Sequence, residues 1–195
     1  MQGNYNGVAP YLISPQQGLQ TALGSDVKID YVAGCDIDSK DTSGFSAAET
    51  AAAGADATVI MVGMTQAQES EGHDRTSIDL PGVQHEFISK VADAANGKPV
   101  IVVVMSGGAV DISQERNNDK VNGILFVGYP GQSGGTAIAE TLVGTNNPAG
   151  RLTQTFYYSN FTDDVSMFDM NMRPNETSGY PGRTHRFFTG RTVYK

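Results

Sequence analysis

Three short runs of continuous apolar and β-branched residues most constrain how this 195-residue chain can fold. They lie at residues 57–62, 100–104 and 123–127. Continuous runs of this kind are typical of strands covered on both faces, whereas a half-solvated strand alternates polar and apolar residues. Helical patterns follow at residues 82–95 and 134–143. The sequence therefore predicts an α/β fold: a mostly parallel sheet covered by helices on both faces, which is an α/β sandwich.

The N-terminal part of the chain carries signals for three further elements. Residues 14–17 form a capping-box pattern with Pro at the first helical position, which predicts a helix over residues 15–23. Residues 27–33 alternate polar and apolar side chains and predict a strand. Residues 45–55 form an Ala-rich helical pattern introduced by the hydroxyl side chains at 42–43, and such a small face can lie close to a sheet.

The periodic patterns disappear at residue 156. The remaining stretch is rich in Asn, Asp, Pro, Gly and aromatic residues, which predicts an irregular, extended C-terminal arm over residues 156–195 of the same domain. The sandwich core then occupies residues 1–155. Asn160 and Asn175 each begin an Asn-x-Thr motif and are candidate glycosylation sites.

Charge and cysteine content exclude several classes of function. Thirteen Lys and Arg against twenty-one Asp and Glu give a formal net charge of -8, so we expect no nucleic-acid partner and no binding to an anionic membrane. Cys35 is the single cysteine, and the three His show no paired ligand spacing, so no metal and no cofactor are expected. We find no apolar run long enough for a membrane span and no signal-peptide pattern.

A polar loop over residues 64–75 follows the first continuous apolar run. In a parallel sheet, catalytic groups gather in loops beyond the carboxyl ends of the strands, so this loop is the first place to look for a site. Glu69 and Glu71 are two residues apart and would face the same way in an extended backbone. Their like charges would then favour keeping one of them protonated, as a general acid requires. The alternative interpretation is that both are solvated carboxylates.

Other polar motifs favour structural roles. Asp74 and Arg75 are expected to make a structural ion pair or to cap the next helix, and His73 gains interest only from its neighbours. Residues 128–135 are glycine-rich but lack the Gly-Lys-Ser/Thr of a Walker loop, so their glycines favour tight strand-to-helix packing over anion binding. Residues 106–108 follow a buried run but lack the Gly-x-Ser-x-Gly frame of a nucleophile elbow.

Five ordered segments form a distinctive set. They are residues 69–75 (Glu-Ser-Glu-Gly-His-Asp-Arg), 80–84 (Leu-Pro-Gly-Val-Gln), 106–111 (Ser-Gly-Gly-Ala-Val-Asp), 128–135 (Gly-Tyr-Pro-Gly-Gln-Ser-Gly-Gly) and 147–152 (Asn-Pro-Ala-Gly-Arg-Leu). This set resembles the C-terminal α/β sandwich domain of glycoside hydrolase family 3. Residues 3–15 and 170–188 look most like its β-xylosidase branch, especially the fungal enzymes. The resemblance spans essentially the whole chain.

The resemblance implies a retaining exo-β-xylosidase, which releases xylose from xylo-oligosaccharides during xylan breakdown through a covalent glycosyl-enzyme. In this family the nucleophile is an Asp on an N-terminal (β/α)8 barrel, and the sandwich domain supplies the acid/base Glu. Glu69 lies nearer the strand end and is the favoured acid/base, while Glu71 is the alternative acid/base or an orienting group. His73, Asp74 and Arg75 become candidate substrate-loop residues.

The resemblance also implies what residues 1–195 lack. They are too few to hold a barrel of ~250 residues as well, and they stop where the family's fibronectin III-like domain would begin. The chain is therefore expected to be inactive without the N-terminal barrel of the same enzyme, and the parent enzyme is expected to be extracellular. A non-catalytic carbohydrate- or protein-binding sandwich module is the alternative function, and β-glucosides or α-L-arabinofuranosides are the alternative substrates.

Overall fold

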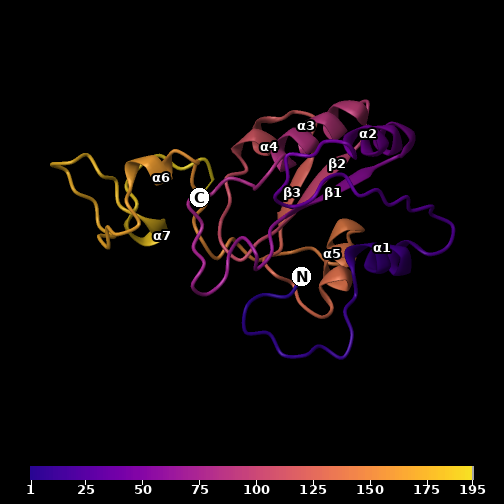
Figure 1. The fold of residues 1–195 in the computed structure, drawn as a ribbon, viewed down its shortest axis with the longest axis horizontal. Helices are drawn as coiled ribbons and strands as arrows, with labels where there is room; N and C mark the ends of the chain where they lie inside the picture. Colours follow the sequence, from indigo (N-terminus) through magenta and orange to yellow (C-terminus); the bar gives the residue numbers. More distant parts are fainter. Residues whose placement is uncertain (195) are drawn as a thin grey trace.

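The computed structural model describes residues 1–194 and has a three-stranded parallel sheet at its centre (Figure 1). The strands are β1 (Thr58–Gly63), β2 (Val100–Met105) and β3 (Gly123–Phe126). They pair in chain order, with Val59 opposite Ile101 and Val102 opposite Ile124. Each strand coincides with one of the three continuous apolar runs, so these strand predictions are confirmed.

Helices cover both faces of this sheet. Helices α2, α3 and α4 lie over one face, and α1 and α5 lie over the other (Figure 1). Their bounds are α1 (Pro15–Leu23), α2 (Phe45–Gly54), α3 (Gln84–Ala94), α4 (Ser113–Asn117) and α5 (Gly134–Leu142). A helix follows each strand, so every connection is a crossover of the kind that parallel pairing requires. The predicted α/β sandwich is confirmed.

The main core lies between the sheet and helices α2 and α3. Ile60, Val102 and Val104 of the sheet are buried there, together with Ile88 and Val91 of α3. Burying each such side chain contributes roughly 1.5–3 kcal/mol. The buried positions of α2 are largely alanine, which lets this helix lie close to the rest of the core.

The opposite face depends on the close contact of α1 with α5. The capping box at the start of α1 is present, because the Ser14 hydroxyl accepts from the Gln17 N–H at 3.2 Å and the Gln17 side chain accepts from the Ser14 N–H at 2.8 Å. Farther along α1, a Cβ on Gly18 would lie 2.1 Å from the carbonyl oxygen of Gly135. The two helices can approach this closely only because both positions are glycine.

Two local predictions need correction, and one helix was not predicted. Residues 27–33 do not form a strand, because no backbone ladder joins them to β1 within the described residues. Alternation there reflects extended backbone, with Val32 packed on the core and Tyr31 exposed, but alternation alone does not supply a pairing partner. The N-cap of α2 is Gly44, and no hydroxyl side chain caps this helix. Helix α4 was not anticipated, because five residues are too few to show a period.

The C-terminal arm contains two four-residue helices, α6 (Phe161–Asp164) and α7 (Thr184–Phe187), and extends away from the sandwich (Figure 1). It is attached at its base, where the Ser159 N–H donates to Asp111 Oδ2 at 2.7 Å. Beside this bond the rings of Phe126 and Phe156 meet edge to face, with centroids 5.0 Å apart. Across residues 1–194, none of the helices has the length and apolarity that a membrane crossing needs.

Candidate active site

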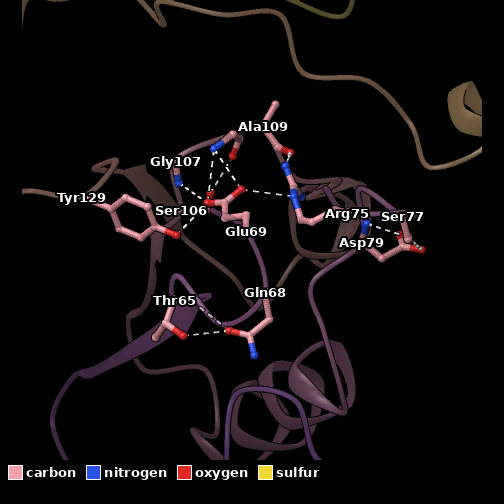
Figure 2. A network of polar contacts seen from close by, with 11 residues as sticks. Thr65, Gln68, Glu69, Arg75, Ser77, Asp79, Ser106, Gly107, Ala109 and Tyr129 are labelled. Atoms are coloured by element: carbon pink, nitrogen blue, oxygen red, sulfur yellow. Dashed lines mark hydrogen bonds and ion pairs between the residues drawn. The ribbon is translucent and has the colours of Figure 1, made fainter. Parts of the chain in front are cut away.

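Three loops meet at the carboxyl edge of the sheet. The polar loop at residues 64–80 follows β1, the loop at 106–112 follows β2, and the loop at 127–133 follows β3. Parallel strands end at the same edge, so loops distant in sequence become neighbours there. The sequence selected only the first of these loops, yet side chains or backbone from all three form one polar network (Figure 2).

Glu69 is the centre of that network (Figure 2). Its Oε1 accepts from the Tyr129 hydroxyl at 2.7 Å and from the Gly107 N–H. Its Oε2 accepts from the Gly108 N–H at 3.3 Å and forms an ion pair with Arg75 Nε at 3.1 Å. The Glu69 side chain is only 15% exposed, and each of these partners is a donor. Both oxygens of the Glu69 carboxyl group are therefore occupied by hydrogen-bond donors of the domain itself.

Gly107 and Gly108 have to be glycine because the Glu69 and Arg75 side chains lie against their backbone. A Cβ on Gly107 would lie 3.0 Å from Glu69 Oε1, and a Cβ on Gly108 would lie 2.5 Å from Arg75 Nη2. Residues 106–108, which lack the frame of a nucleophile elbow, instead form a backbone cradle for a carboxylate. Sequence reasoning missed this role, although two glycines directly after a buried strand are a signal for close backbone approach to another group.

Tyr129 is the other residue that sequence reasoning missed. Burial raises its pKa, and the hydrogen bond to Glu69 and the charge of Glu69 raise it further, to about 12. The hydroxyl therefore stays protonated and donates to Glu69 at any ordinary pH. The N-terminal segment lies against this network, because a Cβ on Gly3 would be 3.1 Å from the Tyr129 ring and the Gln66 side chain donates to the Gly3 carbonyl.

Glu71 has different surroundings from Glu69. Ser70 and His73 exchange two backbone hydrogen bonds, of 3.2 and 3.0 Å, which close a tight turn with Glu71 and Gly72 at its tip. Gly72 has φ +73°, a left-handed conformation that a turn of this kind requires at its third position. The chain is therefore not extended here, and the expectation that both glutamates face the same way is wrong. Glu71 is exposed, and its side chain makes no hydrogen bond or ion pair within residues 1–194.

Of the remaining candidate residues in this loop, Arg75 belongs to the Glu69 network, whereas His73 and Asp74 do not. Arg75 makes a structural ion pair, as expected, but its partner is Glu69, and its Nη2 also donates to the Ala109 carbonyl at 3.1 Å. His73 closes the turn and Asp74 follows it, and both are exposed.

The candidate glycosylation residues lie in the arm, outside the network. Asn160 is the N-cap of α6, and Asn175 accepts the Thr177 N–H at 3.0 Å; both are exposed. The part of the chain described by the structure contains no group of three or more His, Cys, Asp or Glu able to hold a metal ion.

Comparison with known proteins places this geometry in a family. The chain matches the glycosyl hydrolase family 3 C-terminal domain over residues 1–194. It is 48% identical over 194 residues to a β-xylosidase/α-L-arabinofuranosidase 2 of Medicago sativa subsp. varia. It is 46% identical over 195 residues to the exo-1,4-β-xylosidase xlnD of Emericella nidulans. Both alignments cover 100% of this chain but only 24% of the relative.

A solved structure agrees with these relatives. The family 3 exo-β-xylosidase XlnD, in complex with a xylobiose aziridine activity-based probe, superimposes with a TM-score of 0.91 and 45% identity. The match covers 100% of this chain and 25% of that one. The chain therefore belongs to glycosyl hydrolase family 3, in which it corresponds to the C-terminal domain.

Proposed function

We propose that this chain is the acid/base-contributing domain of a retaining exo-β-xylosidase that acts on xylo-oligosaccharides. The observation that carries the proposal is a loop at the carboxyl edge of the sheet with two glutamates in opposite surroundings, one anchored and one free. The relatives named as β-xylosidases support the substrate class. The nucleophile is proposed to lie on an N-terminal barrel, outside the quarter of the relatives' length that this chain spans.

Within this proposal, Glu71 is the acid/base and Glu69 is a positioning residue. Proximity to the strand end favoured Glu69, but both of its oxygens already accept from donors within the domain. A general acid needs an oxygen that faces the substrate and can alternately hold and release a proton. Glu71 is exposed at the tip of the Ser70–His73 turn, so it is the glutamate of the pair whose carboxyl group is open to a substrate.

The proposed reaction has two steps. Glu71 first donates its proton to the glycosidic oxygen while the nucleophile attacks the anomeric carbon, so that the C–O bond breaks and a glycosyl-enzyme forms. The Glu71 carboxylate then takes a proton from water, whose oxygen displaces the nucleophile. Both steps need the two carboxyl groups about 5 to 5.5 Å apart. The bonds of Glu69 with Arg75 and Tyr129 hold the loop so that this spacing is kept.

A second substrate class has one specific support. The Medicago relative is named as both a β-xylosidase and an α-L-arabinofuranosidase. We therefore propose α-L-arabinofuranosides as the second substrate to be assayed beside β-xylosides.

The test uses a complete enzyme. Residues 1–195 replace the matching segment of the Emericella nidulans xylosidase, and Glu71→Gln, Glu69→Gln and the exposed control Glu140→Gln are compared on aryl β-xylosides with good and poor leaving groups. For Glu71→Gln we expect kcat/KM to fall roughly 100- to 10,000-fold with poor leaving groups and less with good ones. Sodium azide should restore part of the rate, because it replaces the missing base.

The two glutamates give different results under this proposal. Glu69→Gln should lower activity without azide rescue, since the loss is one of loop position, and Glu140→Gln should change nothing. Azide rescue at position 69 instead of 71 would reverse the assignment. Full activity in both loop variants would remove the catalytic role and leave a non-catalytic sandwich module as the function.

A further inference from the structure

The C-terminal arm exposes a short apolar segment, residues 167–170. Met167 is 63% exposed, Phe168 is 89% exposed and Met170 is 84% exposed. Single exposed apolar side chains are ordinary, but three within four residues, on an arm that extends from the domain, are typical of a surface that another body covers.

Side chains elsewhere in the arm hold this segment in place by donating to backbone carbonyls in and beside it, and the arm has no buried apolar core of its own. Arg183 donates to the Asp169 carbonyl and, at 3.0 Å, to the Asn171 carbonyl, while the Tyr180 hydroxyl reaches the same Asn171 oxygen at 3.2 Å. Beside the segment lies an open hollow of about 680 Å³, which is lined only by residues of the arm, among them Met170, Arg173 and Tyr180. The segment is therefore presented outward on an ordered backbone while its side chains remain unpacked.

The position of the arm indicates what covers it. Asp111, which holds the base of the arm through Ser159, lies in the same loop after β2 that cradles Glu69 through Gly107 and Gly108. The arm therefore leaves the sandwich on the side of the catalytic loop (Figure 1). A domain that brings a nucleophile to Glu71 has to approach from that side.

The length of the relatives indicates which part of the protein covers residues 167–170. This chain spans 24% of the Emericella enzyme, and its whole length, arm included, superimposes on one quarter of the XlnD chain with a TM-score of 0.91. An arm without its own core thus has the same overall course where it belongs to a much longer polypeptide. We infer that residues 167–170 dock on the nucleophile-bearing domain of the same enzyme, as a strap that fixes the orientation of the two domains; the inference rests on the proposed function.

The experiment measures protection of the methionines, a readout independent of catalysis. The swapped enzyme is treated with hydrogen peroxide, and sulfoxide formation at Met167 and Met170 is followed by peptide mass spectrometry in the native and the urea-unfolded enzyme. We expect oxidation at least tenfold slower in the native enzyme. Equal rates in the two states would overturn the inference, even if the Glu71 variant behaves as proposed.

Variants of the segment test the strap directly. Phe168→Ser should raise the oxidation rate of Met167 and Met170 in the native enzyme towards the rate in the unfolded enzyme. Tyr31→Ser, which removes an exposed aromatic side chain outside the arm, should leave the oxidation rate unchanged. Protection that disappears on dilution, together with a fall in sedimenting mass, would overturn docking on the same enzyme and assign the surface to a second copy. Protection that persists in an enzyme whose Glu71 variant is fully active would support the docking and reject only the catalytic proposal.

Discussion

At Glu69 both carboxylate oxygens accept hydrogen bonds, and at Glu71, two residues later, the carboxyl lies at the tip of a turn in solvent. The types and spacing of these residues were readable from the sequence, and so was the loop that carries them. Their different surroundings were not, because these depend on Tyr129, 60 residues from Glu69 along the chain, and on the cradle at Gly107, 38 residues from it. Residues that become neighbours only through the order of the strands in the sheet show no local pattern in the sequence.

A second polar pair at the residue scale links α3 to α4. His85 Nδ1 lies 2.6 Å from Glu115 Oε1, and the Glu115 side chain is only 1% exposed. Burial by itself would lower the pKa of His85, but the hydrogen bond to Glu115 and its charge, with smaller contributions from Asp79 and Asp111, outweigh burial and raise the pKa above its ordinary value.

The raised pKa predicts how stability depends on pH. A group whose pKa is higher in the folded state contributes stability that is complete below its unfolded pKa, 6.5, and is lost as pH rises through the folded pKa. Urea unfolding should therefore show that His85→Gln destabilises the chain more at pH 5.5 than at pH 9. The exposed His185→Gln is the control, and an equal loss at both pH values for His85→Gln would contradict the assignment.

At the scale of elements, agreement between sequence and structure follows from how local each signal is. The capping box of α1 and the continuous runs of β1, β2 and β3 are complete within a few residues and are found where expected. Residues 27–33 carry a strand pattern without a strand, because pairing needs a partner backbone that no local pattern specifies.

The contact between α1 and α5 gives a prediction at this scale. Gly18→Ala should lower the free energy of unfolding by about 2 kcal/mol or more, because the new Cβ would meet the Gly135 carbonyl and backbone must shift. Gly54→Ala, at the end of α2 with no heavy atom within 4 Å of the new Cβ, should be neutral or stabilising by up to ~1 kcal/mol. Equal effects of the two substitutions, measured by urea unfolding, would argue against close helix contact.

At the scale of the whole molecule, net charge and exposed apolar surface oppose each other. The formal charge of -8 keeps copies of the isolated chain apart, while the segment at residues 167–170 favours association once the charge is screened. Sedimentation of the isolated chain should show a mean mass that rises with protein concentration. This rise should be steeper in 0.5 M NaCl than at low salt concentration. Phe168→Ser should weaken this rise. A constant mass under all conditions would show that the segment does not drive association.

The turn between Ser70 and His73 has a consequence for how such a domain can change over time. Enzymes commonly sacrifice stability at the residues that do chemistry, so activity and folding compete at the same positions. Here the groups that secure the loop are Glu69, Arg75 and Tyr129, whereas the Glu71 side chain makes no hydrogen bond or ion pair with any of residues 1–194. Under the proposed role of Glu71, one substitution at the tip can silence the enzyme while leaving the domain folded, so hydrolase and inert module are separated by a single mutational step.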